Sequence, residues 1–160
     1  MSAVPWYRDA TARSFILRRY VPWLLGLNLA WEIVQLPLYT IWREGTALYI
    51  AYAVAHCTVG DVLIGSAALA LALMATRAHS MAHWNWRGIA AITATASAAY
   101  TLVSEWLNTS LRQSWQYSEL MPKLELPGLD IGAAPLAQWL IVPLAALYLA
   151  RHASLSARRA

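Results

Sequence analysis

The stretch from Leu48 to Thr76, LYIAYAVAHCTVGDVLIGSAALALALMAT, decides the fold. Asp61 is the only Asp, Glu, Lys or Arg residue in this stretch. The stretch exceeds the ~20 apolar residues that a helix needs to cross a bilayer. It therefore predicts a transmembrane helix rather than a helix of a soluble core. Because it is longer than the hydrocarbon layer requires, we expect it to tilt or to project from the membrane.

The rest of the chain has the composition of a membrane protein. Hydrophobic residues make up 59% and charged residues 12% of the 160 residues, against about 45–50% and about 25% in soluble domains. A soluble chain of this length cannot bury so much apolar surface in one core. Further spans are expected at about 20–42, 88–111 and 135–149, the first of them uncleaved. The sequence predicts an all-α integral membrane protein, a four-transmembrane-helix bundle, with residues 1–160 as a single domain.

The basic residues predict the orientation of the bundle. Nine lie before the first span, between the second and third, or after the fourth, and three lie on the opposite side. The nine are Arg8, Arg13, Arg18, Arg19, Arg77, Arg87, Arg151, Arg158 and Arg159, and the three are Arg43, Arg112 and Lys123. The positive-inside rule places the nine in the cytoplasm. We therefore expect a multi-pass protein of a cell membrane, of the bacterial inner-membrane type, with both termini cytoplasmic.

The longest connection is the outer loop at 112–132, RQSWQYSELMPKLELPGLDIG. Pro122 and Pro127 prevent one continuous helix. The loop is rich in leucine and too apolar for a solvated linker. We expect it to lie against the outer mouth of the bundle like a lid, since long ordered loops often have this role. The alternative, a segment that rests on the lipid headgroups, stays open.

Polar side chains recur on one face of three spans, at spacings of three and four residues. Asp61 lies about 140° around its helix from His56, at about 100° per residue. A rise of ~1.5 Å per residue puts Glu32, His56 and Glu105 in the outer half of the bilayer and Asp61 nearer its centre. The sets are Asn28, Glu32, Gln35 and Tyr39 in the first span, Tyr52 and His56 in the second, and Thr101, Ser104, Glu105 and Asn108 in the third.

Ionisable groups at this depth point to chemistry. A charge at the bilayer centre costs at least ~2.5–3.5 kcal/mol, and no lysine or arginine lies in the same layer. A proton or a metal ion must then neutralise the carboxylates. We predict an acid–base enzyme of the isomerase, cyclase or hydratase type that acts on a lipophilic substrate. The predicted acid and base are Glu105 and Glu32, tuned by His56 and Asp61.

A second group of residues is expected to bind or orient the substrate. Amide, hydroxyl and aromatic side chains can hold water or a polar headgroup, and aromatic rings can stabilise a developing cation. This group comprises Asn28, Gln35, Tyr39, Tyr52, Thr101, Asn108, Trp31, Trp106, Trp115 and Tyr117.

Three other functions are compatible with the same pattern. The chain could be a non-catalytic subunit or assembly factor that pairs its polar stripe with a partner helix. It could be a proton- or ion-coupled carrier, although the inner half of the second span offers no polar track. It could hold a divalent metal through His56, Asp61, Glu32 and Glu105, although no HExxH or ExxH motif is present.

The remaining expectations concern cofactors and partners. The sequence requires no cofactor, and a divalent metal is left open. Expected partners are the lipid bilayer, a lipophilic small molecule, and either a homo-oligomer or a larger membrane complex. The basic residues are not arranged for nucleic acid, because they sit at segment ends beside the headgroups. The single cysteine, Cys57, excludes an intramolecular disulfide.

Overall fold

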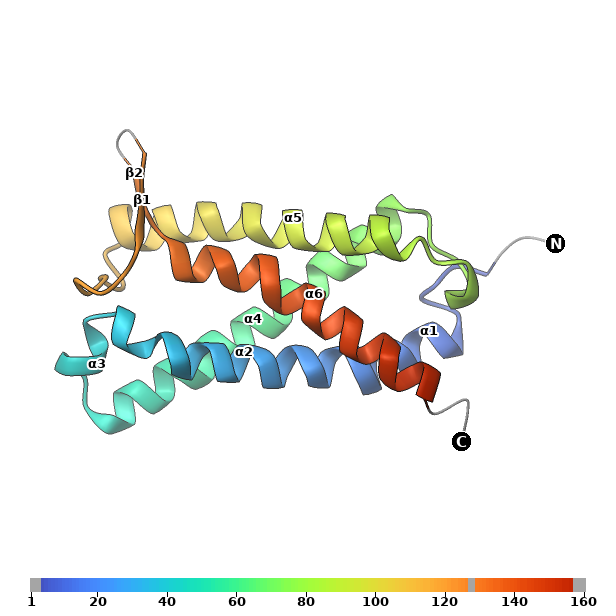
Figure 1. Ribbon diagram of the computed structural model, residues 1–160, viewed down its shortest axis with the longest axis horizontal. Coiled ribbons are helices and arrows are strands. Elements are labelled where there is room, and N and C mark those ends of the chain that lie inside the picture. Colours follow the sequence, from blue (N-terminus) through green and yellow to red (C-terminus); the bar gives the residue numbers. More distant parts are fainter. Residues whose placement is uncertain (1–3, 127–128, 157–160) are drawn as a thin grey trace.

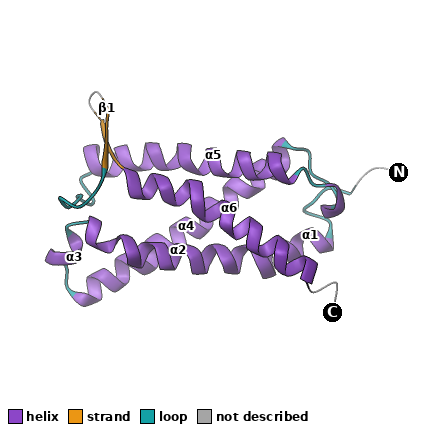
Figure 2. Cartoon of the chain, viewed as in Figure 1, coloured by secondary structure: helices purple, strands orange, loops and turns teal. Residues whose placement is uncertain are grey.

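The computed structural model describes residues 4–126 and 129–156. Most of these residues are helical (Figure 2). Three helical segments are long and apolar enough to cross a membrane, Ala10–Leu38, Ala47–Ala75 and Ala133–Ser154. These segments are compatible with a multi-pass membrane protein. Arg158 and Arg159, two of the nine basic residues from which the orientation is predicted, lie outside the described residues.

The first long segment consists of four helical pieces in succession: α1 (Ala10–Phe15), a π-helical turn η1 (Ile16–Tyr20), α2 (Val21–Gln35) and a 3-10 turn η2 (Leu36–Leu38). It begins earlier than the predicted residue 20 because Asp9 caps it, accepting a 2.9 Å hydrogen bond from the Thr11 amide. It ends before the predicted residue 42 because Tyr39, after Pro37, has extended backbone angles. The helical segment Ala10–Leu38 thus starts and ends earlier than the span predicted at 20–42.

Two of the remaining helices, α4 (Ala47–Ala75) and α5 (Trp86–Glu105), start at side-chain caps. Thr46 accepts from the amide of Tyr49 at the start of α4, and Asn85 accepts from the amide of Gly88 at the start of α5. The π-helical η4 (Trp106–Leu111) extends α5. α6 covers Ala133–Ser156, which is longer than the predicted 135–149. Two short helices, α3 (Ile41–Glu44) and η3 (Met81–His83), lie in the connections.

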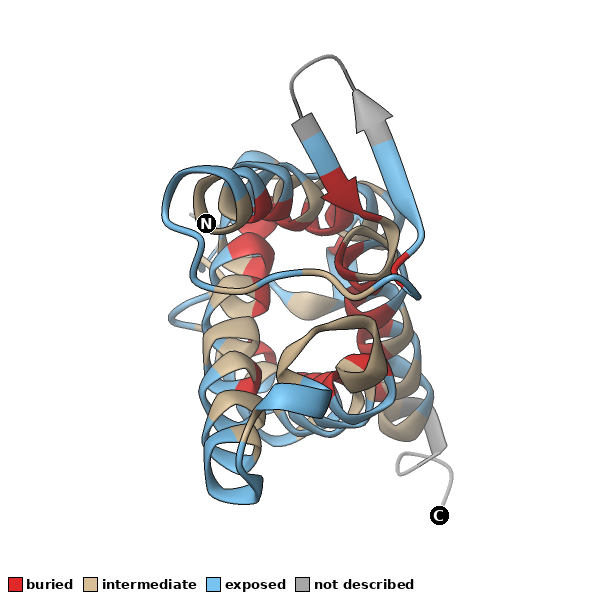
Figure 3. Ribbon diagram, turned by 90° about the vertical axis from the view of Figure 1, so that its left-hand side faces the viewer, coloured by how far each residue is buried: buried red, intermediate tan, exposed pale blue. Residues whose placement is uncertain are grey.

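The long helices extend between the same two ends of the molecule, and α4 and α6 cross obliquely relative to α2 and α5 (Figure 1). α2 packs on α4 and α6, and α5 packs on the same two helices. α1, η3 and the C-terminal turns of α6 lie at one end, which we call the terminal end. α3, η4 and the two strands lie at the other, which we call the strand end (Figure 1). The view from the strand end shows the buried residues on the inward faces of the helices (Figure 3).

The apolar core lies toward the terminal end. The rings of Phe15, Trp84 and Trp86 pack with centroids 5.2–5.8 Å apart. Leu24 and Leu69 are fully buried beside them in the same core cluster. The strand end has no matching block of buried apolar side chains among the described residues. Packing therefore fixes the helices at one end, and polar contacts organise the other.

Close approach of α2 and α4 depends on a glycine. A Cβ at Gly65 would lie 2.8 Å from the Leu24 Cδ2 atom. The carbonyl of Gly65 also accepts a 3.3 Å hydrogen bond from the Tyr20 hydroxyl. A small residue at such a contact lets two helices approach each other, as is common in membrane proteins.

Residues 112–122, which follow η4, cross the strand end, and we call them the crossing segment. Its residues bond to the chain that follows α2: Thr40 N donates to Gln116 O at 3.1 Å, and Ser118 N donates to Leu38 O at 2.9 Å. The chain then forms β1 (Lys123–Leu126) and β2 (Leu129–Gly132), which pair antiparallel. The strands lie within the loop predicted at 112–132, for which the sequence analysis proposed no strands. Pro127 and Gly128 lie outside the described residues.

Candidate functional site

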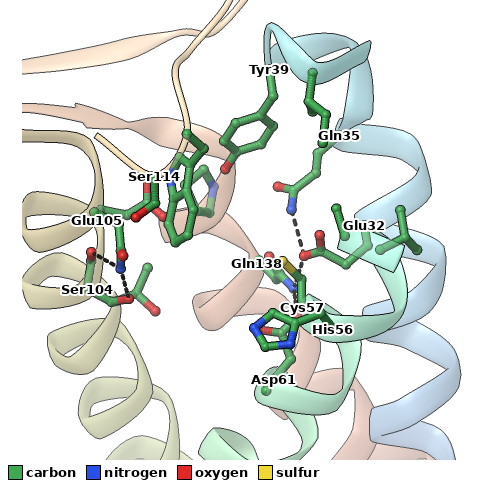
Figure 4. A pocket seen from close by; sticks show the side chains of 18 of the residues that line it. Glu32, Gln35, Tyr39, His56, Cys57, Asp61, Ser104, Glu105, Ser114 and Gln138 are labelled. Atoms are coloured by element: carbon green, nitrogen blue, oxygen red, sulfur yellow. Dashed lines mark hydrogen bonds between the residues drawn. The ribbon is translucent and has the colours of Figure 1, made fainter. Parts of the chain in front are cut away.

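A cavity of about 500 Å³ lies at the strand end, lined by α2, α4, α5, the start of α6 and the crossing segment. All four predicted acid–base residues line it: Glu32, His56, Asp61 and Glu105. Figure 4 shows Glu105 on one wall with Ser104 and Ser114, and Glu32, Cys57, Asp61 and Gln138 grouped on the opposite wall. Tyr39 points into the space between them (Figure 4).

The predicted substrate-binding residues divide into two groups. Six line the cavity, namely Gln35, Tyr39, Tyr52, Thr101, Asn108 and Trp115. Four are not part of its lining, namely Asn28, Trp31, Trp106 and Tyr117. Trp31 instead donates to the Gln35 side chain at 3.2 Å, and Trp106 is substantially exposed. Asn28 bonds to the lining residue Gln138, and Tyr117 bonds to the lining residue Glu105.

Gln138 connects three helices on one wall. Its Nε2 atom lies 2.9 Å from Asn28 Oδ1, 2.8 Å from Asp61 Oδ2 and 3.4 Å from Glu32 Oε1. Gln138 is 2% exposed and Asn28 is fully buried. Each of these polar groups needs a partner when it is buried. The amide thus holds α2, α4 and α6 together at the level of the carboxyl groups.

Glu32 and Asp61 form a carboxyl pair on the same wall. Both accept from the Gln138 amide, and Gln35 Nε2 donates to Glu32 Oε1 at 2.7 Å. This wall therefore places two carboxyl groups beside one buried amide donor.

Glu105 is held on the opposite wall by the crossing segment. The Tyr117 hydroxyl donates to Glu105 Oε2 and accepts a 3.0 Å hydrogen bond from the Gly132 amide. Glu105 is 5% exposed. The spacing of polar residues along the helices gave no indication of Tyr117 as the partner of Glu105, because the two lie on different elements.

The protonation of Tyr117 should appear in the stability of the protein at alkaline pH. Burial, and then the hydrogen bond and charge of Glu105, raise the pKa of Tyr117 above its usual value of 10.0. The folded state therefore retains a proton that the unfolded state loses above about pH 10. Its contribution to stability is complete below that pH and is lost as the pH rises toward the folded pKa. We expect the thermal midpoint of the native protein to fall above about pH 10, and to fall less in Tyr117→Phe.

The control for this measurement is Tyr148→Phe on α6, because Tyr148 is 67% exposed. It should leave the alkaline slope of the midpoint unchanged. Equal slopes for the native protein and Tyr117→Phe would show that Tyr117 titrates alike in the folded and unfolded states.

His56 lies at the rim of the cavity. Its side chain is exposed, and its ring stacks on Tyr52 with centroids 5.6 Å apart and an interplanar angle of 18°. Both residues line the cavity, four positions apart on α4. The tuning roles predicted for His56 and Asp61 stay predictions. Asp61 lies on the same wall of the cavity as Glu32 (Figure 4).

Some polar groups of the site have no protein partner. Thr101 is 4% exposed and lines the cavity, and its hydroxyl has no hydrogen-bond partner among the described residues. The indole nitrogen of Trp115 is likewise buried without a completed hydrogen bond within the described chain. Buried polar groups are normally satisfied, so each such group is available to a water or a ligand.

The described residues contain no group of three or more His, Cys, Asp and Glu side chains placed to hold a metal ion. Glu105 lies across the cavity from Glu32 and Asp61 (Figure 4). The four candidate ligands predicted from the sequence therefore do not converge on one point.

Sequence reasoning did not assign several residues of the lining to the site. Gln138 was not among the predicted site residues, and Cys57 was considered only as the single cysteine. Trp139, Tyr49 and Tyr100 add aromatic surface. These residues line the cavity because of the way α4, α5 and α6 are rotated about their axes. The spacing of apolar residues does not specify this rotation where apolar residues surround a helix.

Comparison of the chain with protein-family models, with curated proteins and with solved structures found no match.

Proposed function

We propose that the chain is a membrane enzyme that performs acid–base chemistry on a lipophilic substrate in the cavity at the strand end. The carrying observation is a cavity of about 500 Å³ whose lining includes Glu32, Asp61 and Glu105 and contains no lysine or arginine. Carboxyl groups kept away from cations and water are suited to hold and release protons. Neutral donors fix their positions: Gln35 and Gln138 on one wall, and Tyr117 on the other.

The reaction that this arrangement supports best is the shift of a carbon–carbon double bond, or a ring closure that begins in the same way. Glu105 as acid donates a proton to one alkene carbon, which leaves a carbocation. The Glu32–Asp61 pair then removes a proton from a carbon on the other side of the cation, and the electron pair of that C–H bond forms the new double bond. One proton enters and one leaves, so no oxidant, reductant or co-reactant is required.

Deuterium incorporation tests this function without knowledge of the substrate. The protein in lipid nanodiscs is incubated in D₂O with the lipid extract of its native membranes, and the lipids are analysed by mass spectrometry. An acid whose proton exchanges with solvent should add one deuterium to its substrate or product. A lipid species with deuterium above the level of empty nanodiscs supports the proposal. A lipid profile identical to that of empty nanodiscs contradicts it.

We further propose that α2, α4, α5 and α6 all cross the membrane, with the terminal end in the cytoplasm. Among the described residues, the elements and connections of the terminal end carry Arg8, Arg13, Arg18, Arg19, Arg77, Arg87 and Arg151, and those of the strand end carry Arg43, Arg112 and Lys123. This distribution follows the positive-inside rule. α5 has several threonine and serine residues on its buried face, which makes it less apolar than the other three.

Lys123 gives an all-or-none test of this orientation, because it is the only lysine in the chain. A membrane-impermeant amine reagent added to intact spheroplasts should modify Lys123 and leave the N-terminal amine unmodified. After the membrane is made permeable, both amines should react. In Lys123→Arg the intact spheroplasts should give no modification. Reaction at the N-terminus of the native protein in intact spheroplasts would reverse the orientation.

A further inference from the structure

Acidic side chains outnumber basic ones in the lining of the cavity. The lining contains three carboxyl groups, those of Glu32, Asp61 and Glu105, and one imidazole, that of His56. No arginine or lysine is part of the lining. A negative charge at this depth in a membrane is costly, by at least ~2.5–3.5 kcal/mol. A positively charged ligand would remove this cost.

The chemistry of the lining favours an organic cation over a metal ion. A metal ion needs several ligands at about 2.0–2.6 Å from one point, and the described residues include no such group. An ammonium group needs only a negative environment and aromatic faces within about 6 Å. The cavity supplies these faces through its tyrosine and tryptophan side chains: Tyr39, Tyr49, Tyr52, Tyr100, Trp115 and Trp139.

The cavity also reaches the outer surface of the helices. Tyr52 on α4 and Tyr100 on α5 line it, yet they are 61% and 53% exposed. Nearby side chains on the outer faces of α4 and α5 are apolar and exposed, among them Val59 and Val103. A hydrocarbon chain that leaves the cavity between these two tyrosines would therefore meet lipid. Thr101, whose buried hydroxyl has no hydrogen-bond partner in the described chain, is also part of the lining.

From these observations we infer that the cavity binds an amphiphile with an ammonium head and a hydrocarbon tail, the head between the carboxyl walls and the tail between α4 and α5. The inference rests on the proposed site and names the chemical class of its ligand. It also fits the proposed reaction, because an ammonium group resembles the carbocation that protonation of an alkene would form.

Cys57 provides a direct readout of occupancy. It is the only cysteine of the chain, and its sulfur faces the cavity (Figure 4). A methanethiosulfonate reagent transfers its thioalkyl group to the thiolate and releases methanesulfinate, so the mass of the protein reports modification of this one residue. We expect the ethyltrimethylammonium reagent to modify Cys57 faster than the ethylsulfonate reagent, after each rate is divided by its rate with the denatured protein.

Protection of Cys57 then tests the class of ligand. Dodecyltrimethylammonium, dodecanol and dodecanoate share one tail and differ in the charge of the head. At equal membrane-bound concentrations in nanodiscs, the ammonium compound should slow modification by a neutral methanethiosulfonate at least about tenfold more than the other two, as expected from one desolvated charge or cation–π contact. Glu105→Gln should reduce this difference. Cys57→Ser controls for modification elsewhere.

Two results would overturn the inference: equal protection by all three compounds, or stronger protection by dodecanoate. Protection by none of them would also do so, because it would leave the cavity closed to a chain of this kind. If Glu105→Gln does not fold, the comparison of three compounds on the native protein still decides. None of these results bears on deuterium incorporation, so the ligand class and the proposed reaction can fail separately.

Discussion

Replacement of Glu105 by glutamine should lower the rate of deuterium incorporation by about 10²- to 10⁴-fold, the usual contribution of a positioned general acid or base. Glutamine keeps the size of the side chain, and its carbonyl oxygen can still accept the hydrogen bond from Tyr117. It cannot give up a proton to an alkene. The fold should therefore persist while the chemistry is lost. The rate is measured with the same nanodiscs and lipid extract, by the mass shift of the labelled species.

Glu44→Gln is the matched control for this loss. Glu44 is an exposed carboxyl group at the end of α3, at the same end of the molecule but outside the lining of the cavity. The same change of charge there should leave the rate unaltered. If Glu105→Gln retains the rate of the native protein, Glu105 is not the acid, and the proposed division of roles between the two walls is wrong.

The helical fold could be read from the sequence because lipid imposes simple rules. A helix satisfies its own backbone hydrogen bonds, so an apolar stretch of sufficient length such as Leu48–Thr76 has few alternatives in a bilayer. The observed bounds of α4, Ala47–Ala75, differ from that prediction by one residue at each end. The first span was less predictable, because its start depends on the Asp9 cap and its end on the backbone of Tyr39.

The strand pair carries a local signal that was not used. The segment from Lys123 to Gly132, KLELPGLDIG, alternates apolar and polar residues on both sides of a Pro-Gly dipeptide. Alternation with period two around such a dipeptide is typical of a hairpin. The leucine content alone instead predicts a lid against the outer mouth of the bundle, or a segment that rests on the lipid headgroups. The attachment of Ser118 to Pro37 O at 2.8 Å depends on tertiary packing, which no local pattern reveals.

The candidate site was predictable in its residue types and less so in its geometry. Spacing placed Glu32 and Gln35 on one face of α2, and these two side chains hydrogen-bond to each other. Spacing could not show whether Trp31 and Trp106 face the cavity, because an aromatic residue in a membrane helix can face lipid or protein equally well. It also placed Asp61 on a flank of its helix, where the contact with Glu32 depends on the rotation of α4 against α2.

Replacement of Gln138 by leucine should destabilise the protein by about 2 kcal/mol, the largest loss of stability that we expect from a single side chain of the site. Its amide donates to Asn28 Oδ1 at 2.9 Å and to Asp61 Oδ2 at 2.8 Å. Leucine has a similar volume and leaves both acceptors buried without this donor. Each unsatisfied group costs about 1–3 kcal/mol, and interhelical hydrogen bonds in membranes average about 0.6 kcal/mol, with a maximum near 1.7. Thermal unfolding in a mild detergent measures the loss, and Gln116→Leu at an exposed position is the control.

The double variant Asn28→Leu with Gln138→Leu separates a hydrogen bond from a packing effect. Removal of both partners leaves no orphaned amide between α2 and α6, so the double variant should be less destabilised than the sum of the two single variants. Part of the cost should persist, because Asp61 still lacks its donor on α6. If the two losses are simply additive, Gln138 acts through its volume alone. The wall that positions Glu32 and Asp61 would then depend on packing rather than on the amide.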